Sequence, residues 1–427
     1  MRYQQSLFLV ALGGMLLISC KKDKESDPPQ IFISSPFDGQ SLAVPDTFTI
    51  VADVTDDKGP IQGTVVLTNG FGVPIGPVFT FNSDGTSTNI NFNYPVVSEQ
   101  IASGPHSLRI SVSDGDNTTN AFRTINVVGT PLRFRGLFAV TASGAVHKVD
   151  SAFNVTTLGA YGQDVNDAAI SSRQQLLYVA GAETGPLIAI DVNTGATRWQ
   201  VTNNGSGGEP YFSYCSMNDE MNLMLIGKRS GTLHVMNPAY GSNITTHNIS
   251  SSRLPISGLI TGNNVISIES QTISQTTRFV TRNLYSDNAL TETIIDQQTV
   301  DLFQRDEDHA LVFGNENGTG RVTDMNFSSG FGFEPHAFGQ GEIADVVQVD
   351  EDTYLLVLPD GITRYTYNPD QALLLSALVP QQLAYDPANG MLFASTGTTL
   401  HVLDANTGFE TMTVVLPAIP LKLLVLL

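Results

Sequence analysis

Residues 187–199, LIAIDVNTGATRW, and residues 400–412, LHVLDANTGFETM, carry the same pattern at two distant places in the chain. In each stretch an apolar run ends at an aspartate, a turn of sequence D-x-N-T-G follows, and a threonine-containing run leads away from it. Aspartate caps such a turn with its side chain, and glycine adopts the positive φ that closes it. The pattern therefore predicts two antiparallel strands joined by a tight turn.

The same strand–turn–strand unit occurs seven times after Pro131. Its turn positions are Asp150, Asp191, Asn237, Asn283, Asn326, Asn368 and Asp404. Successive turn positions lie 41, 46, 46, 43, 42 and 36 residues apart, and a four-stranded propeller blade needs about 40–45 residues. We therefore expect residues 132–427 to form a seven-bladed β-propeller.

The two most regular copies of the unit resemble the repeats of YVTN-type and quinoprotein-like propellers. Quinoprotein dehydrogenases add a pair of cysteines and a set of metal-binding residues to this fold. The present chain has only two cysteines, Cys20 and Cys215, and we expect the first of them to be lipidated. The resemblance therefore implies the propeller fold, and we expect neither a cofactor nor a metal centre.

The last seven residues, LKLLVLL at 421–427, predict a strand that belongs to no repeat of its own. The first repeat, entered at residues 137–140, lacks an inner strand, whereas the other six repeats each have a candidate. We expect the C-terminal strand to fill this position, because pairing the two ends of a propeller leaves no sheet edge open. The six candidate inner strands are 168–171, 211–216, 256–260, 300–304, 343–349 and 382–385.

Residues 30–129 show short apolar alternations separated by Gly, Pro, Asp and Asn, which is typical of half-buried strands. We count about seven strands, taking residues 90–94 together with residues 108–112. Residues 104–115, GPHSLRISVSDG, resemble the penultimate hairpin of bacterial Ig-like and cadherin-like domains. The predicted fold class is therefore all-β, an Ig-like β-sandwich followed by a seven-bladed β-propeller closed by the C-terminal strand.

Residues 1–19 predict an export signal, since Arg2 precedes an apolar run at 7–18 that is too short to stay in the membrane as a helix. The sequence LISC, ending at Cys20, resembles the lipobox of bacterial lipoproteins, in which the cysteine thiol receives diacylglycerol. The resemblance implies lipidation of Cys20 and a charged tether at 20–29, as in outer-membrane lipoproteins of Gram-negative bacteria facing the periplasm or the cell surface. A secretory signal with a chance cysteine is the alternative.

The charge balance and the missing motifs exclude several functions. The chain has 21 Lys and Arg against 41 Asp and Glu, so a nucleic-acid partner, which needs cationic neutralisation, is excluded. His147, His234 and His401 occupy the same position in separate repeats, so they cannot converge on one metal. No H-E-x-x-H, C-x-x-C or G-x-S-x-G motif occurs, and we expect Cys215 to be a buried, inert thiol.

Two faces of the predicted propeller differ in composition. Acidic segments at 219–220, 306–308 and 350–352 are expected in turns after the inner strands, where we interpret them as solubilising residues. The opposite face carries our candidate binding residues, because aromatic and arginine side chains favour docking. These are Tyr161, Glu183, Lys228, Arg229, Arg253, Asn315, Glu316, His336 and Phe338. We interpret Phe331 and Phe333 as core residues of the fifth blade.

The sequence thus favours a non-enzymatic, lipid-anchored protein of the cell envelope, with no catalytic residues. Its propeller would present a face to a protein or glycan partner, as an accessory subunit of an outer-membrane complex does. The alternative is an extracellular polysaccharide hydrolase or lyase that uses Glu183, Glu209 or Glu342 at the channel mouth. Two acids with raised pKa values about 5–9 Å apart in a cleft would favour this alternative.

Overall fold

The computed structural model describes residues 27–57, 59–98, 101, 103–162, 164–203, 211–250, 252–271, 276–339 and 341–427. Cys20 and the expected export signal lie outside the described residues. The chain divides into two compact units, one ending at Thr130 and the other beginning at Pro131. Among the described residues, no helix is long and apolar enough to cross a membrane.

The first unit consists of two sheets that share one apolar core. One sheet has the order β1-β3-β6, with β1 at Gln30–Ser35, β3 at Asp46–Thr55 and β6 at Ser87–Val96. The other has the order β2-β8-β7-β4-β5, with β2 at Gln40–Ala43, β8 at Thr118–Val128, β7 at Gly104–Ser113, β4 at Ile61–Thr68 and β5 at Phe79–Ser83. The two segments that we counted together, 90–94 and 108–112, belong to different sheets, so this unit has eight strands in its described part.

The second unit contains seven four-stranded antiparallel sheets among its described residues. From the inner to the outer strand, the first four blades are β36 (Lys422–Leu426), β9 (Gly136–Val140), β10 (Ala145–Val149), β11 (Val155–Ala160); β12 (Val165–Ser171), β13 (Leu176–Gly181), β14 (Leu187–Asp191), β15 (Thr197–Val201); β16 (Phe212–Asn218), β17 (Leu223–Lys228), β18 (Thr232–Asn237), β19 (Ser242–Asn248); and β20 (Arg253–Thr261), β21 (Asn264–Gln271), β22 (Thr277–Asn283), β23 (Ala289–Ile295). The last three are β24 (Gln298–Gln304), β25 (His309–Glu316), β26 (Thr319–Asn326), β27 (Gly332–Phe338); β28 (Asp345–Gln348), β29 (Thr353–Leu358), β30 (Gly361–Thr366), β31 (Gln371–Ser376); and β32 (Gln382–Asp386), β33 (Met391–Thr396), β34 (Thr399–Asp404), β35 (Glu410–Val415).

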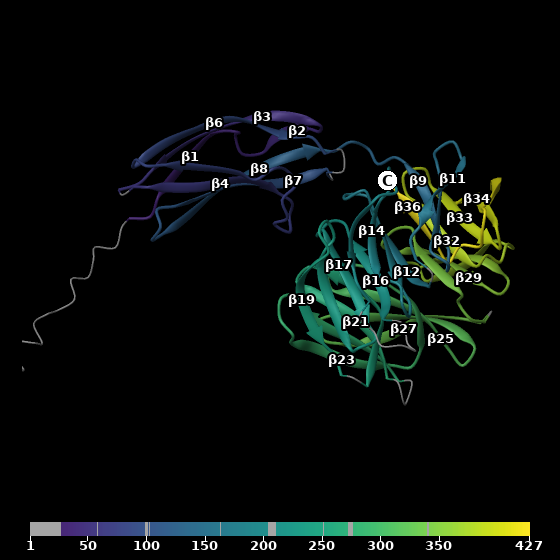
Figure 1. Cartoon of the computed structure of the whole chain (residues 1–427). Coiled ribbons are helices and arrows are strands. Elements are labelled where there is room, and N and C mark those ends of the chain that lie inside the picture. The colour runs from purple at the N-terminus through teal and green to yellow at the C-terminus, as the bar shows by residue number, and fades with distance from the viewer. Residues whose placement is uncertain are drawn as a thin grey trace, which may run out of the picture. The chain divides into compact units, whose positions relative to one another are not determined.

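The C-terminal strand β36 closes the ring, as the sequence predicts. It pairs antiparallel with β9, from Lys422 opposite Val140 to Leu426 opposite Gly136. In Figure 1 the yellow strand β36 lies beside the blue strand β9. The inner strands also contact one another in sequence from β12 through β16, β20, β24, β28 and β32 to β36, which returns to β12. The first blade is therefore built from both ends of the propeller unit.

The apolar core of the propeller lies between neighbouring blades. Each cluster of buried side chains joins two blades, and the series closes on itself where Leu137 of the first blade packs with Phe393 of the seventh. Strand β13, with the sequence LLYVAG, is buried along its whole length because blades cover both of its faces. Each blade thus depends on its neighbours for burial.

The predicted turn chemistry is present in the structure. Asp191 Oδ1 accepts hydrogen bonds from the backbone N–H groups of Asn193 (3.0 Å) and Thr194 (2.9 Å), and Gly195 has a φ of 72°. Asp404 Oδ1 accepts the equivalent bonds, and Gly408 has a φ of 71°. The aspartate cap and the glycine together therefore fix the turn between the third and fourth strands of the second and seventh blades.

Two faces of the ring follow from this strand order. The turn face holds the turns between first and second strands and between third and fourth strands of each blade. The loop face holds the loops between second and third strands and the connections between blades, so every inner strand starts at the loop face. The predicted acidic segments lie on the turn face: 219–220 follow β16, 306–308 follow β24 and 350–352 follow β28.

Candidate functional site

The inner strands enclose a channel with two cavities. One cavity, of about 470 Å³, is lined by β12, β16, β20, β24 and β36, and the other, of about 310 Å³, by β24, β28, β32 and β36. Both are lined by Asp301, Phe303, Lys422 and Leu424, so they adjoin in the middle of the ring. Volumes of this size lie in the range of small-ligand pockets, about 300–1,000 Å³.

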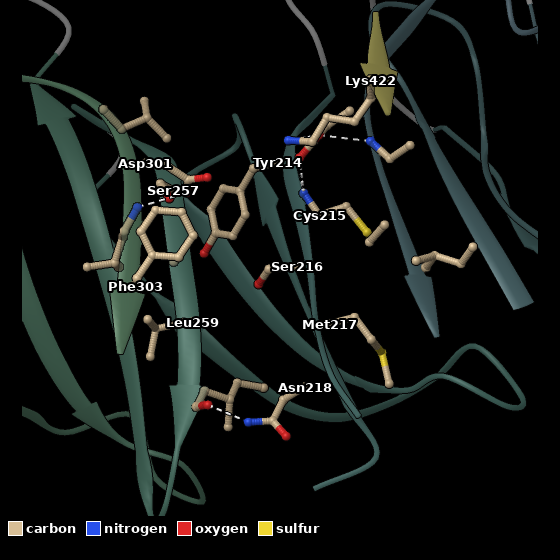
Figure 2. A pocket seen from close by; sticks show the side chains of 18 of the residues that line it. Tyr214, Cys215, Ser216, Met217, Asn218, Ser257, Leu259, Asp301, Phe303 and Lys422 are labelled. Atoms are coloured by element: carbon tan, nitrogen blue, oxygen red, sulfur yellow. Dashed lines mark hydrogen bonds and ion pairs between the residues drawn. The ribbon is translucent and has the colours of Figure 1, made fainter. Parts of the chain in front are cut away.

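Three aspartates and one lysine set the charge of this channel. Figure 2 shows Lys422 reaching from β36 across the cavity, with Asp301 on the far side. Lys422 Nζ lies 3.4 Å from Asp167 Oδ1. The carboxylate of Asp167, and after it those of Asp301 and Asp345, raises the pKa of Lys422 although burial opposes the charge. The cluster is therefore held together by one ammonium group among three carboxylates.

The other two channel carboxylates, those of Asp301 and Asp345, have raised pKa values. Burial raises the pKa of Asp345 to about 6 and also raises the pKa of Asp301. Asp345 Oδ2 accepts a hydrogen bond from the Leu383 N–H at 2.6 Å, and Asp167 Oδ2 accepts one from the Cys215 N–H at 2.9 Å. Asp345 and Asp167 therefore each link one blade to the next as well as facing the channel.

A repeated irregularity of the inner strands precedes two of the three channel aspartates, Asp167 and Asp301. The register of β12 shifts between Val165 and Asp167, and that of β24 shifts between Thr299 and Asp301. Strands β16 and β20 have the equivalent shift, after which Tyr214 and Ser257 follow. A bulge re-aims the side chain that comes after it. The channel aspartates were not among our candidates, although their shared place near the start of inner strands could have identified them.

Cys215 lies beside this cluster but has the properties of a structural residue. Its side chain is buried, as we predicted, and burial raises the pKa of its thiol well above the ordinary value. A thiol that stays protonated is a poor nucleophile. In the described part of the chain, no group of three or more His, Cys, Asp or Glu side chains could hold a metal ion.

Four of the nine candidate binding residues have structural roles within the propeller. Three of them, Tyr161, Asn315 and Arg253, make hydrogen bonds to other parts of the unit, and the fourth, Phe338, is buried. The Tyr161 hydroxyl donates to the Gly195 carbonyl at 2.8 Å, and Asn315 exchanges two hydrogen bonds with the backbone of Ile343. The Arg253 guanidinium makes two bonds to the Glu292 carboxylate, at 2.9 and 3.1 Å.

Phe338 is the clearest correction among the candidates. It is 2% exposed because it packs with Val322, Tyr354 and Tyr365 between the fifth and sixth blades. Because side chains alternate along β27, this position points inward. Phe338 therefore cannot contact a partner at the surface.

The other five candidates lie on or near the surface but belong to several blades. Glu183 is exposed in the loop after β13, and Lys228 Nζ lies 5.1 Å from the centre of the Tyr211 ring, with Arg229 next in the chain. Glu316 pairs with Arg321, whereas His336 Nδ1 lies 3.0 Å from an Asp370 carboxylate oxygen. Of the acids proposed for catalysis, Glu342 is exposed, Glu209 lies outside the described residues, and neither Glu183 nor Glu342 lines the two channel cavities.

The turn face carries a set of exposed aromatic side chains that sequence reasoning missed. Each occupies the turn between the third and fourth strands, in the third, fourth, fifth and seventh blades. They are Tyr240, Tyr285, Phe331 and Phe409, with 77, 66, 67 and 71% of their surface exposed. Phe333 is 48% exposed. Our prediction that Phe331 and Phe333 are core residues of the fifth blade is therefore wrong. The turn sequence after Asn326 places Phe331 outside the strand ladder.

The same face is strongly acidic. Its described turns contain two arginines, Arg173 and Arg305, against eleven carboxylates. These are Asp150, Asp219, Glu220, Asp287, Asp306, Glu307, Asp308, Asp350, Glu351, Asp352 and Asp370. A surface with this balance attracts cations and repels anions.

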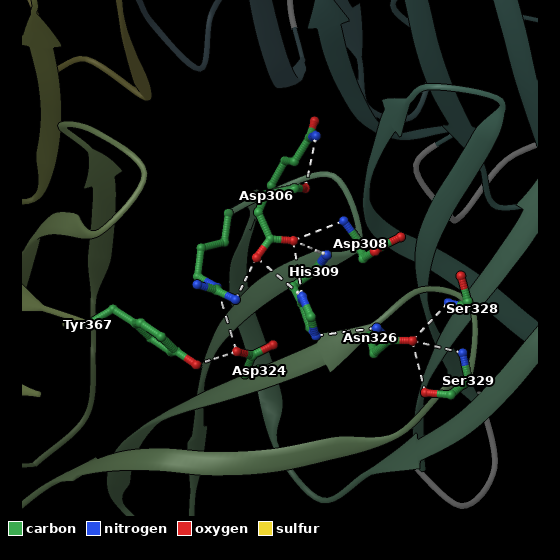
Figure 3. Close-up of polar contacts among 10 residues, drawn as sticks. Asp306, Asp308, His309, Asp324, Asn326, Ser328, Ser329 and Tyr367 are labelled. Carbon is green, nitrogen blue, oxygen red and sulfur yellow. Dashed lines mark hydrogen bonds and ion pairs between the residues drawn. The ribbon is translucent and has the colours of Figure 1, made fainter.

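One acidic turn is ordered by an extended polar network (Figure 3). Asp306 Oδ1 accepts from the backbone N–H groups of Asp308 (2.9 Å) and His309 (2.8 Å), and it also contacts His309 Nδ1 at 3.0 Å. The Arg305 guanidinium lies 4.5 Å from the centre of the Tyr367 ring, and the Tyr367 hydroxyl donates to Asp324 at 2.5 Å. The network joins the fifth and sixth blades and gives the turn face a fixed shape there.

Neither a protein-family model nor a curated protein matches the sequence. A solved protein from Lactobacillus plantarum is similar over 69% of this chain and 100% of its own, with a TM-score of 0.54 and 13% identity. A quinonprotein alcohol dehydrogenase-like protein from Bacteroides thetaiotaomicron VPI-5482 has a TM-score of 0.48 at 13% identity, covering 93% of this chain and 99% of its own. The Myceliophteria thermophila Cps50 (Swd1) β-propeller domain has a TM-score of 0.46 at 10% identity, covering 60% and 87%. At such identities a likeness concerns the fold alone, and the chain is an all-β protein with a β-propeller of repeated blades.

Proposed function

We propose that this chain is a non-enzymatic binding protein of the bacterial cell envelope, whose propeller presents its turn face to a protein partner. In this proposal Cys20 carries the lipid anchor in the outer membrane, and residues 30–129 act as an Ig-like spacer. The observation that carries the proposal is the set of four exposed aromatic side chains at equivalent turns of one face.

Physical chemistry favours a basic protein surface as the partner. Burying a large apolar side chain contributes about 1.5–3 kcal/mol, so Tyr240, Tyr285, Phe331 and Phe409 offer several anchors. The eleven carboxylates of the same face favour lysine and arginine on the other side, and such complementarity accelerates association. A rigid ring also loses little conformational entropy on binding.

The loop face remains the alternative docking surface, through Glu183, Lys228, Arg229, Glu316 and His336. A glycan in place of a protein is the alternative partner. Variants that alter one face and leave the other intact distinguish the two surfaces, and chemical identification of the bound partner distinguishes a protein from a glycan.

The test is affinity purification of the tagged protein from its native envelope, followed by identification of partners by mass and a direct binding measurement with the purified partner. Replacing Tyr240, Tyr285, Phe331 and Phe409 by alanine is expected to weaken binding more than tenfold, because one anchor contributes about 1–2 kcal/mol. The Lys228→Ala/Arg229→Ala variant is the matched control and should bind normally. Loss of binding in the control alone would move the interface to the loop face.

A second candidate function is cleavage of a polysaccharide in the channel, by hydrolysis or by lyase-type elimination. The observation that favours it is the pair of channel carboxylates with raised pKa values, Asp301 and Asp345, because enzymes use such groups as general acids. The test is turnover of a polysaccharide panel by the protein and by its Asp301→Asn and Asp345→Asn variants. Cleavage that both substitutions abolish would establish the enzymatic function, and absence of cleavage by the unaltered protein would exclude it for that panel.

A further inference from the structure

A cleft between the fourth and fifth blades shares no lining residue with the two channel cavities. Its cavity, of about 280 Å³, is formed by β23 of the fourth blade, by residues 296–297 that connect the two blades, and by β25, β26 and β27 of the fifth blade. Two threonines of β23 hold the fifth blade in place: Thr291 Oγ1 donates to the Phe327 carbonyl at 3.1 Å, and Thr293 Oγ1 donates to the Gly330 carbonyl at 2.6 Å. The cleft is therefore preformed.

One part of the cleft is apolar and open to water. Phe333 and Ile294 both line it, and they are 48 and 51% exposed. An aromatic ring beside a branched aliphatic chain offers a dry surface to a ligand that has an apolar side. Neither residue belongs to a core cluster of the propeller, so packing does not account for their presence there.

The polar part of the cleft combines one guanidinium with several acceptors. Arg321 Nε lies 3.0 Å from Glu316 Oε2, and Arg321 Nη1 donates to the Glu334 carboxylate. Asp296 also lines the cavity. The lining therefore carries three carboxylates and one guanidinium, a formal charge of −2, which disfavours an anionic ligand.

The oxygen of one buried amide in the lining lacks a hydrogen-bond partner among the described residues. Gln297 is 6% exposed, and its Nε2 donates to the Val312 carbonyl at 3.1 Å. Its Oε1 is buried without a hydrogen-bond partner among the described residues. A buried acceptor without a donor is unfavourable, but this oxygen exposes almost no surface to the cleft, so it is not one of the groups that contact a ligand.

We propose that this cleft binds a neutral sugar unit of a glycan. The C–H face of a pyranose ring packs against Phe333 and Ile294. Its hydroxyl groups donate to the carboxylates of Glu316 and Glu334, and they accept from Arg321. The charge of the lining selects against uronic acids and sulfated sugars. This proposal is independent of the protein partner proposed for the turn face.

The experiment is isothermal titration calorimetry of the purified protein with neutral tetrasaccharides of glucose, mannose, galactose and xylose, and with tetragalacturonate as the anionic probe. We expect at least one neutral tetrasaccharide to bind and tetragalacturonate not to bind. Phe333→Ala should weaken the binding about tenfold, since loss of an aromatic contact of about 1.4 kcal/mol corresponds to that factor. Phe333→Trp should restore it.

Phe71→Ala is the matched control, because Phe71, in the first unit, is 49% exposed and belongs to no proposed binding surface. It should bind the same tetrasaccharide as the unaltered protein does, and equal melting temperatures of the variants would show that folding is unaffected. Either of two results with the neutral probes would overturn the proposal: binding of none of the four, or binding that Phe333→Ala leaves unchanged. Preference for tetragalacturonate would also contradict it.

Discussion

Asp345→Asn is expected to stabilise the protein at neutral pH. Asp345 stands at the start of the inner strand β28, and burial raises its pKa from 3.8 to about 6. Asparagine keeps the oxygen that accepts the hydrogen bond from the Leu383 N–H, but it removes the buried negative charge. The substitution therefore tests the cost of ionisation with the geometry preserved.

The sign of the effect follows from linkage between protonation and folding. Because the folded protein binds this proton more tightly than the unfolded chain does, the stability that protonated Asp345 contributes is fully present below pH 3.8. It is lost as the pH rises through about 6. A shift of about two pKa units corresponds to ~3 kcal/mol. Asp345→Asn should therefore raise the free energy of unfolding by up to about 3 kcal/mol at pH 7.5, and by progressively less toward pH 4.5.

The assay is urea unfolding of both proteins at several pH values between 4.5 and 7.5. Asp404→Asn is the control, because hydrogen bonds from Thr407 lower the pKa of Asp404 and that substitution should destabilise the protein at neutral pH. Parallel profiles of the unaltered protein and Asp345→Asn over this pH range would refute the reasoning.

Three further substitutions or modifications test the packing of the ring. Lys422→Met removes the cation that faces Asp345, so it should raise the pKa of Asp345 further. It should also lower the free energy of unfolding at pH 7.5 by about 1–3 kcal/mol, which is less than for a fully buried ion pair because water reaches the channel. Urea unfolding at pH 7.5 and at pH 5 measures both effects. In a Cys20→Ser variant, the thiol of Cys215 should resist alkylation at pH 8 in the folded protein and react fully in urea, and rapid reaction of the folded protein would contradict its burial. Tyr367→Phe should lower the free energy of unfolding by about 1.5–3 kcal/mol, since it removes the hydrogen bond to the Asp324 carboxylate, and an unchanged urea midpoint would show that this bond contributes little.

The repeats of the second unit could be predicted because their signals are local. An aspartate or asparagine that caps a turn, followed by a glycine with positive φ, identifies a blade at positions such as Asp191 and Asp404. The C-terminal strand could be placed by counting strands, since a closed ring requires each blade to have an inner strand. Seven repeats with six inner strands left one vacancy, which Lys422–Leu426 fills.

The channel charges and the exposed aromatics could not be predicted in the same way. Lys422 is the one charged residue of an apolar strand, and its partners Asp167, Asp301 and Asp345 come from three different blades. Only closure of the ring brings these four residues together. Similarly, Phe331 looks like a strand residue in sequence, but the turn that begins at Asn326 keeps its side chain in water.

Hydrogen exchange of the backbone amides in the C-terminal strand tests the closure of the ring most directly. Backbone groups that pair in a sheet exchange slowly, whereas those of a free tail exchange at once. If β36 closes the ring, the amides of residues 422–426 will be protected to the same degree as those of the inner strands β12 and β32, and removal of residues 421–427 will deprotect β9. Exchange of residues 422–426 within seconds, with β9 unaffected by their removal, would contradict this architecture.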